Sequence, residues 1–338
     1  MKVDNINSDL NVVYAVDDNF AQILGVSIES LLRNTENFYK VRIFIIDGGI
    51  GQENKDKIES LLKSRERRFI TWLQAVNITE ELNIPVSIDR GSITQYARLF
   101  ISRLIPPAIT RVLYLDCDVL IIKSIVNLWN LNLGNKVAGV LQDAFSKEYR
   151  RNIQLKKSAV MFNSGVMLID INNWRKQDIE KKLLQFIIDN KGTIQQGDQG
   201  VLNAILYDKI IVIDPKYNVV TIMFDFTYSE LLIYRKPMNY YSKEQIERAT
   251  AAPVIVHFTS SFLSERPWEI GCNHPYKNAW LANQHMTPWK EADLRRNGKG
   301  YKVKAYVAIG QILPRKWFIE FSGLLQAYLR PLLFRLKK

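Results

Sequence analysis

The sequence is poor in cysteine and contains no long apolar run. Its two cysteines, Cys117 and Cys272, lie far apart in the chain and in no metal-binding spacing, so a disulfide framework is not expected. No stretch of about 18 consecutive apolar residues is present, which argues against a membrane-spanning helix. Residues 1–6 lack the apolar core of a signal peptide. These absences favour a protein of the reducing cytoplasm.

Glycine-rich phosphate loops are also missing. Neither G-x-G-x-x-G nor G-x-x-x-x-G-K-S/T occurs, which argues against dinucleotide-binding and P-loop chemistry. Acidic residues are scarce at the C-terminal end, where residues 295–338 hold eleven lysines and arginines but only one acidic residue, Glu320. The net charge of +12 is therefore concentrated there, and the rest of the chain is nearly neutral. A nucleic-acid-binding protein is not expected.

The composition and the alternation of patterns predict an α/β fold. With 338 residues, 47% of them apolar, the chain can bury a large core. Short apolar runs alternate with helical patterns, which is typical of a largely parallel sheet with helices on both faces. Strands are expected at 11–16, 41–47, 69–75, 112–115, 137–141, 161–169, 211–213 and 254–258. Helices are expected from near Phe20 and at 52–65, 93–104, 173–189 and 199–206.

Two carboxylates follow one of these strands. Asp116 and Asp118 come directly after the apolar run 112–115, with Cys117 as a spacer between them. Released from a strand into a loop, both can reach one hard cation such as Mg²⁺ or Mn²⁺, which keeps positions open for substrate phosphates. The alternative for an isolated Asp-x-Asp is a strand end followed by a solvated acidic turn.

Other polar residues lie at strand ends as well, and each has two interpretations. Asp17 and Asn19, followed by Phe20, could bind a nucleotide base and ribose, or Asp17 could cap a helix. His257 ends the apolar run 254–256, where its imidazole could complete a metal site or serve a structural purpose. In parallel sheets, ligands collect at the carboxyl ends of the strands.

Two further motifs interrupt regular patterns. Asn163-Ser164-Gly165 lies inside the apolar stretch 161–169, and a glycine inside a strand often marks the close approach of a ligand or another backbone. Gly197-Asp198-Gln199 opens a predicted helix, where Asp198 fits as a cap.

The order of these motifs resembles glycosyltransferase family 8, the retaining enzymes that include bacterial lipopolysaccharide galactosyl- and glucosyltransferases. The resemblance extends over roughly residues 10–285. The matching stretches are YAVDDNF at 14–20, ITQYARL at 93–99, VLYLDCDVL at 112–120, FNSGV at 162–166, GDQGVL at 197–202, and His257-Phe258 with Pro267-Trp268.

This resemblance implies a GT-A fold, a Rossmann-like nucleotide-binding fold with a mixed, mainly parallel sheet, which binds a UDP-sugar with Mn²⁺ or, alternatively, Mg²⁺. Asp116, Asp118 and His257 match the metal ligands. The positions that match donor-binding residues are Ala15, Asp17, Asn19, Phe20, Arg98, Asn163, Ser164 and Arg266. Asp198 and Gln199 match catalytic positions, with Gln199 near the anomeric carbon, and Asp143 matches an acceptor-side acid.

The chain departs from the family pattern at two of these positions. Arg266-Pro267-Trp268 replaces the usual Lys-Pro-Trp and follows His257 after a longer spacer, so the reach of Arg266 to the diphosphate is open. Phe20 replaces a common tyrosine, keeping its ring face and losing its hydroxyl.

The resemblance implies transfer of a hexose, galactose or glucose, from UDP-sugar to a glycan or lipid-linked glycan acceptor, with an α linkage. No carboxylate is an obvious nucleophile, so our hypothesis for retention is same-face attack by the acceptor. The sequence leaves two alternatives open. Asp-x-Asp after a strand is also similar to the first motif of haloacid-dehalogenase-type phosphohydrolases, and a non-catalytic, membrane-bound glycan-binding protein is the other.

The C-terminal segment, residues 286–338, is predicted to be a tail separate from a single domain at 1–285. We name it the C-terminal tail. It carries one apolar helical stripe with basic residues around it, interrupted at Pro331. The stripe consists of Trp317, Phe321, Leu324, Leu325, Tyr328, Leu332 and Leu336. Such a segment is typical of an interfacial helix on anionic lipid, and the basic residues 295–338 would hold the protein on the inner face of the cell membrane. The alternative is a helix packed on the domain with a solvated basic face.

Overall fold

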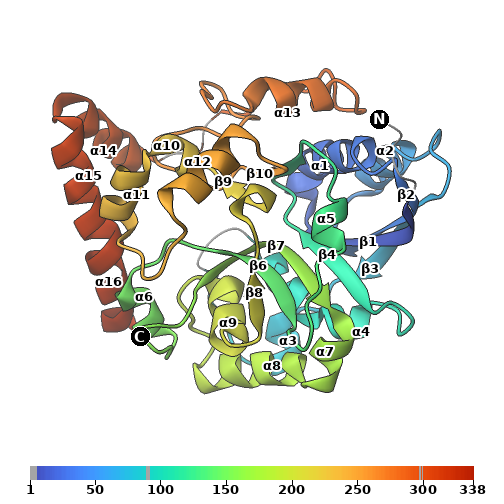
Figure 1. Cartoon of the computed structure of the whole chain (residues 1–338), viewed down its shortest axis with the longest axis horizontal. Coiled ribbons are helices and arrows are strands. Elements are labelled where there is room, and N and C mark those ends of the chain that lie inside the picture. The colour runs from blue at the N-terminus through green and yellow to red at the C-terminus, as the bar shows by residue number, and fades with distance from the viewer. Residues whose placement is uncertain (1–5, 89–91, 297, 299) are drawn as a thin grey trace.

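The computed structural model describes residues 6–88, 92–296, 298 and 300–338. Its centre is a seven-stranded sheet in the order β3-β2-β1-β4-β7-β6-β8 (Figure 1). β7 runs antiparallel to both of its neighbours, β4 and β6, and the other adjacent strands are parallel. The strands are β1 (Ile6–Val16), β2 (Phe38–Asp47), β3 (Arg68–Gln74), β4 (Arg111–Leu115), β6 (Ala138–Gln142), β7 (Phe162–Asp170) and β8 (Ile210–Val212). The predicted mixed, mainly parallel sheet is confirmed.

Helices cover both faces of this sheet. Alternate residues of β1 point to opposite faces, so Val12 and Tyr14 enter one buried core and Val13 enters the other. The helical segments before the C-terminal tail are η1 (Asp18–Phe20), α1 (Ala21–Arg33), α2 (Gln52–Ser60), α3 (Ile78–Leu82), η2 (Ile93–Phe100), α4 (Ile101–Leu104), α5 (Val126–Trp129), α6 (Lys147–Asn152), α7 (Ile171–Lys176), α8 (Ile179–Asp189), α9 (Gly197–Leu206), η3 (Pro215–Tyr217), α10 (Ile222–Asp225), α11 (Tyr228–Arg235), α12 (Lys243–Ala251) and α13 (Lys277–Gln284).

Three predicted helices differ from the observed ones. The helix predicted at 52–65 is α2, which ends at Ser60 and is followed by a turn. The segment predicted at 173–189 consists of α7 and α8, because Asp178 between them has a left-handed backbone with φ of 51°. The segment predicted at 93–104 begins as the 3₁₀ helix η2 and becomes α-helical only at Ile101.

A second, three-stranded sheet was not predicted as a unit. It consists of β5 (Val119–Ile121), β10 (Ile255–His257) and β9 (Val219–Val220), with β10 in the middle. β10 runs antiparallel to β5, and their register pairs His257 with Val119. This pairing brings His257 beside Asp118, the residue that precedes β5.

The C-terminal tail contains α14 (Tyr301–Ile312), α15 (Arg315–Leu324), a π-helical turn η4 (Leu325–Leu329) and α16 (Arg330–Lys337). α15 to α16 lie against α11 and α6 (Figure 1). Ser146 donates to the carbonyl of Ala327 at 2.7 Å, and Asn152 donates to the carbonyl of Pro331 at 2.8 Å. The π-helical turn directly precedes α16, and Pro331 is the second residue of α16, where its missing N–H is tolerated.

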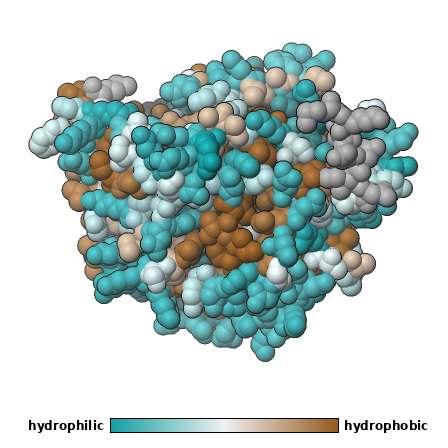
Figure 2. Space-filling model, in the orientation of Figure 1, coloured by the Kyte–Doolittle hydropathy of each residue, from teal (hydrophilic) through white to brown (hydrophobic). Residues whose placement is uncertain are grey.

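The buried face of the tail is not the predicted stripe. Phe318, Ile319, Ser322, Gly323 and Ala327 are buried against the domain. Six of the seven residues of the stripe stay exposed, and Leu325 is half-buried. Apolar side chains are visible along the edge of the molecule over the tail helices (Figure 2). Within the described ranges, no helix combines the length and apolar character needed to cross a membrane. The boundary at 285/286 stays a prediction.

Candidate active site

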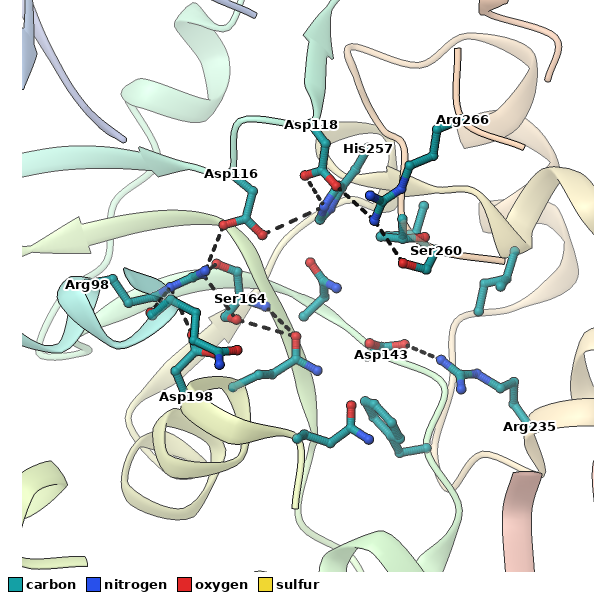
Figure 3. Close-up of a pocket in the computed structure, with 18 of the residues that line it drawn as sticks. Arg98, Asp116, Asp118, Asp143, Ser164, Asp198, Arg235, His257, Ser260 and Arg266 are labelled. Atoms are coloured by element: carbon teal, nitrogen blue, oxygen red, sulfur yellow. Dashed lines mark hydrogen bonds and ion pairs between the residues drawn. The ribbon is translucent and has the colours of Figure 1, made fainter. Parts of the chain in front are cut away.

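A cavity of about 360 Å³ opens where the carboxyl ends of β4 and β6 meet the start of β7 (Figure 3). It brings together most of the residues singled out in the sequence. Those that line it are Phe20, Arg98, Asp116, Asp118, Asp143, Asn163, Ser164, Asp198, Gln199, His257 and Arg266. Their roles stay predictions, but their convergence from distant parts of the chain agrees with the rule that ligands bind at this edge of an α/β sheet.

Ala15, Asp17 and Asn19 do not line this cavity. Asp17 accepts a hydrogen bond from the backbone N–H of Asn19 at 3.1 Å and so caps η1. The backbone oxygen of Asn19 accepts from Arg295 at 2.8 Å, and the carbonyl of Ala15 accepts from the buried thiol of Cys117 at 3.4 Å. The structure thus shows the capping interaction that was the alternative for Asp17, and contact of these three residues with a nucleotide stays a prediction.

Asp116, Asp118 and His257 form a cluster whose potential ligand atoms all lie within 4.8 Å of one another. His257 Nε2 is 3.2 Å from Asp118 Oδ1 and 3.8 Å from Asp116 Oδ2. Asp116 follows β4, Asp118 precedes β5 and His257 ends β10, so both sheets contribute. Two carboxylates and one imidazole are a donor set that suits a divalent cation such as Mn²⁺.

Gly165 makes room for this cluster. A Cβ atom at Gly165 would lie 2.2 Å from His257 Cε1 and 2.7 Å from Asp116 Oδ2, distances that real side chains do not adopt. In addition, the carbonyl of Gly165 accepts the backbone N–H of Asp116 at 2.7 Å. The glycine inside β7 therefore allows the side chains of two other elements to approach its backbone, and the cluster fits a bound metal ion.

The protonation of the cluster follows from its charges. Burial raises the pKa of Asp118, but His257 and Arg266 outweigh burial and hold this pKa below its usual value. Burial lowers the pKa of His257, but Asp118 and Asp116 outweigh burial and raise it. The carboxylates thus favour any positive charge placed between them.

We call the part of the cavity lined by Asp116, Asp118 and His257 the metal end. Arg98 connects this end to Asp198 on the opposite wall. Its guanidinium lies 2.9 Å from Asp116 Oδ1 and 2.9 Å from Asp198 Oδ2, and it donates to the carbonyl of Ser164 at 2.9 Å (Figure 3). Burial raises the pKa of Asp198 to about 6, although Arg98 opposes this effect. Arg98 therefore orders two site aspartates, and direct contact with the donor stays a prediction.

Gln199 and Asp198 lie in the first turn of α9. The backbone N–H of Ser164 donates to Gln199 Oε1 at 3.2 Å. Asn203, one turn later, binds both backbone groups of Phe162, accepting at 2.7 Å and donating at 2.9 Å. These bonds hold the start of α9 against the start of β7, so the side chains of Gln199 and Asn163 line the same cavity.

Arg266 reaches the metal end despite its longer spacer. Its Nη2 lies 3.6 Å from Asp118 Oδ2 and donates to Ser260 Oγ at 2.8 Å. A phosphate bound beside Asp118 would therefore lie near this guanidinium.

Several lining residues were missed in the sequence. Arg235, at the end of α11, lies 3.7 Å from Asp143 and stacks 5.0 Å over the ring of Phe145. No sequence signal pointed to Arg235, because neither α11 nor its position was predicted. The other missed lining residues are Gln95, Phe145, Gln196, Val220, Ile222, Thr259 and Ser260.

A model of glycosyl transferase family 8 matches residues 11–270. The chain belongs to glycosyltransferase family 8. It is 30% identical over 285 residues to general stress protein A of Bacillus subtilis, covering 83% of this chain and 94% of that protein. It is 27% identical over 300 residues to the lipopolysaccharide 1,2-glucosyltransferase of Escherichia coli, covering 87% of this chain and 83% of that protein.

The fold of this family 8 chain is similar to a solved relative. The crystal structure of the galactosyltransferase LgtC, in complex with donor and acceptor sugar analogs, matches with a TM-score of 0.69 and 25% identity, over 82% of this chain and 96% of LgtC. The predicted family and GT-A fold are confirmed. Membership makes the chain a retaining glycosyltransferase and favours glycosyl transfer over the phosphohydrolase alternative.

Proposed function

We propose that this glycosyltransferase moves galactose or glucose from a UDP-sugar to a glycan or lipid-linked glycan, forming an α linkage with the help of Mn²⁺. The observation that carries the proposal is the cluster of Asp116, Asp118 and His257, which faces the same cavity as Asp198 and Gln199. A cation site beside polar groups that can hold a sugar is what transfer from a nucleotide sugar requires.

The metal end of the cavity would bind the diphosphate. Asp116, Asp118 and His257 would hold the ion, which when bound supplies Lewis-acid stabilisation of the charge that develops on the departing UDP. Arg266, 3.6 Å from Asp118, adds a fixed positive charge at the same place. It neutralises part of the phosphate charge in place of the lysine common in the family.

The middle of the cavity would hold the transferred sugar. Asp198, Asn163 and Ser164 offer hydrogen-bonding groups to its hydroxyls, and Gln199 lies beside Ser164. Asp198 is a poor nucleophile because it is buried and paired with Arg98. We therefore favour attack by the acceptor on the face that UDP leaves, and a trapped covalent glycosyl adduct on Asp198 would contradict this route.

The far end of the cavity would bind the acceptor. Asp143 can accept hydrogen bonds from sugar hydroxyls, Arg235 can donate them, and the ring of Phe145 offers an apolar face for a sugar ring.

The decisive experiment is hydrolysis of a panel of UDP-sugars in the presence and absence of Mn²⁺. The wild-type protein should turn over a UDP-hexose only with the metal. Asp118→Ala should abolish this turnover, and Asp208→Ala, which removes an exposed surface carboxylate, should not change it. Turnover of no UDP-sugar, or turnover indifferent to metal and to Asp118→Ala, would overturn the proposal.

The C-terminal tail would attach the protein to the inner face of the cell membrane. Its exposed stripe includes Trp317 and Leu336, whose side chains are 68% and 75% exposed. Apolar side chains of this kind insert into the headgroup region, and nearby lysines and arginines attract anionic lipid.

A further inference from the structure

We infer that Asn218 is a positioning residue that fixes the tautomer of His257, so that the lone pair of Nε2 faces Asp116 and Asp118. The inference deepens the proposed metal-dependent function and rests on it for its purpose. Asn218 does not line the cavity, and no sequence pattern singled it out. It lies between η3 and β9 and is fully buried.

A chain of three hydrogen bonds ends on the imidazole. The backbone N–H of Gly165 donates to Asn163 Oδ1 at 3.0 Å. The same oxygen accepts from Asn218 Nδ2 at 2.9 Å. Asn218 Oδ1 then lies 2.9 Å from His257 Nδ1. The three bonds connect β7 of the large sheet with β10 of the small one.

The first of these three hydrogen bonds determines the donor and the acceptor in the other two. A backbone N–H can only donate, so the side-chain atom of Asn163 that faces Gly165 must be the oxygen. The atom of Asn218 that points to this oxygen must then be the amide nitrogen. Its other atom is therefore the oxygen, which can only accept, so His257 Nδ1 must carry a hydrogen.

The consequence appears on the other side of the ring. In a neutral imidazole with a hydrogen on Nδ1, the lone pair is on Nε2. Nε2 is the atom that lies 3.2 Å from Asp118 Oδ1 and 3.8 Å from Asp116 Oδ2. Asn218 thus presents a metal-binding lone pair beside two carboxylates, and the opposite tautomer would turn an N–H toward them.

The second effect of Asn218 is orientation. The imidazole is buried, and Gly165 leaves it no space to spare on the side of β7. A hydrogen bond to Nδ1 stops rotation of the ring about its bond to Cβ, while Thr221 Oγ1 donates to the backbone oxygen of His257 at 3.4 Å. Partners of this kind typically change metal affinity by about 10- to 100-fold.

The first test needs no variant. Nitrogen NMR of the ¹⁵N-histidine-labelled, metal-free protein, at a pH where the ring is neutral, should show the hydrogen of His257 on Nδ1. The His257→Gln variant identifies this signal among the three histidines. A neutral ring with its hydrogen on Nε2 in the wild-type protein would overturn the inference.

The second test compares variants with Mn²⁺ alone as the probe, by titration calorimetry. Asn218→Ala should weaken Mn²⁺ binding about 10- to 100-fold and remove the preference for the Nδ1 hydrogen. Asn218→Asp removes the donor to Asn163 Oδ1 but keeps an oxygen that accepts from Nδ1, so it should retain Mn²⁺ binding better than Asn218→Ala. Unchanged Mn²⁺ affinity and tautomer in folded Asn218→Ala would overturn the inference.

The experiments distinguish a failure of the positioning role of Asn218 from a failure of the proposed transfer reaction. If wild-type His257 carries its hydrogen on Nδ1 and Asn218→Ala loses it, the positioning role is supported even when no UDP-sugar is turned over. In that case only the proposed transfer reaction fails. If Asn218→Ala does not fold, the wild-type spectrum and Asn218→Asp still decide the question.

Discussion

Two residues of the candidate site lie where there is little space or little solvent: Gly165 is crowded by neighbouring side chains, and the Asp198 carboxylate is buried. Gly165 is a glycine because the His257 ring and the Asp116 carboxylate occupy the place of a side chain. Asp198 is a buried carboxylate whose pKa is raised to about 6 although Arg98 lies 2.9 Å away. A glycine inside a strand and a buried carboxylate both lower the free energy of unfolding, and such costs are common at active sites.

Gly165→Ala should disrupt the metal site directly. The added methyl group would lie 2.2 Å from His257 Cε1, so the ring must move away from Asp118. Overpacking of this kind costs about 1–3 kcal/mol. We expect weaker Mn²⁺ binding in calorimetry and loss of transfer activity. Gly51→Ala is the control, because its methyl group would be no closer than 3.4 Å to a neighbouring atom, and equal Mn²⁺ affinity in both variants would contradict the prediction.

Asp198→Asn should stabilise the fold while reducing activity. The folded-state pKa of about 6 lies above the ordinary value of 3.8, so the ionised carboxylate is disfavoured in the folded protein. The resulting cost is on the order of 3 kcal/mol at pH 8 and disappears as the pH falls through 6 toward 4.

Urea unfolding at pH 8 and pH 5 measures this effect. The stability advantage of Asp198→Asn over the wild type should be largest at pH 8 and smaller at pH 5. An advantage that grows as the pH falls would contradict the assignment of a raised pKa. Transfer activity of the variant should drop, because the amide cannot replace both carboxylate oxygens as acceptors.

Among the helices and strands, short elements position several of the side chains that line the cavity. β5 and β10 have three residues each, yet their antiparallel register pairs His257 with Val119 and so places the imidazole beside Asp118. α11 supplies Arg235 at its end, and α15 packs along α11. We therefore expect the C-terminal tail to support a wall of the cavity through α11.

Gly323→Ala tests this support. Alanine normally stabilises a helix interior by about 1 kcal/mol relative to glycine. Here the Cβ would lie 2.5 Å from the backbone oxygen of Ile233 and 3.2 Å from Tyr234 Cα, so α15 must move away from α11. We expect a lower free energy of unfolding and a raised KM for the acceptor, since Arg235 directly follows Tyr234.

Glu320→Ala, at an exposed position of the same helix, is the matched control. Urea unfolding and acceptor titration measure both variants. A Gly323→Ala protein as stable as the control and with an unchanged KM would show that α15 does not support the cavity wall.

Across the whole molecule, much of the positive charge and many exposed apolar side chains belong to the C-terminal tail. Most of the net charge of +12 belongs to residues 295–338, and the tail helices lie at one end of the molecule (Figure 1). The exposed apolar side chains of the tail lie on the face that does not pack on the domain. One face of α15 packs on the domain, as the second alternative drawn from the sequence expects, and the other face is exposed. Binding of the exposed face to a membrane stays a prediction.

Trp317→Ser combined with Leu336→Ser should reduce membrane binding without disturbing the fold. Both side chains are mostly exposed, so little packing is lost. We expect reduced co-sedimentation with liposomes rich in anionic lipid, and binding of the wild type should weaken as salt is raised. Phe69→Ser is the control, since Phe69 is 50% exposed on β3, away from the tail. Equal loss in both proteins, or none in either, would contradict the membrane role.

The local sequence determined the strands of the large sheet. Apolar runs followed by Asp116 or ending at His257 predict strands with polar residues at one edge, because burial requires the apolar side chains to enter the core. Other lining residues, such as Arg98, Asp143 and Arg266, were assigned to the site only through the family resemblance. The apolar stripe of the C-terminal tail was also predicted from the sequence, because its residues recur at helical spacing. The location of Asp17 as a cap was one of two alternatives that the sequence left open.

Only the tertiary structure decided which distant residues meet. The β5–β10 register, the contact between α11 and α15, and the chain from Gly165 through Asn218 to His257 all join segments far apart in the sequence. Such contacts leave no local periodicity, since they depend on packing and hydrogen-bond geometry that exist only after the chain has folded. For this reason Asp116 and Asp118 were found from the sequence, whereas Arg235 and Asn218 were not.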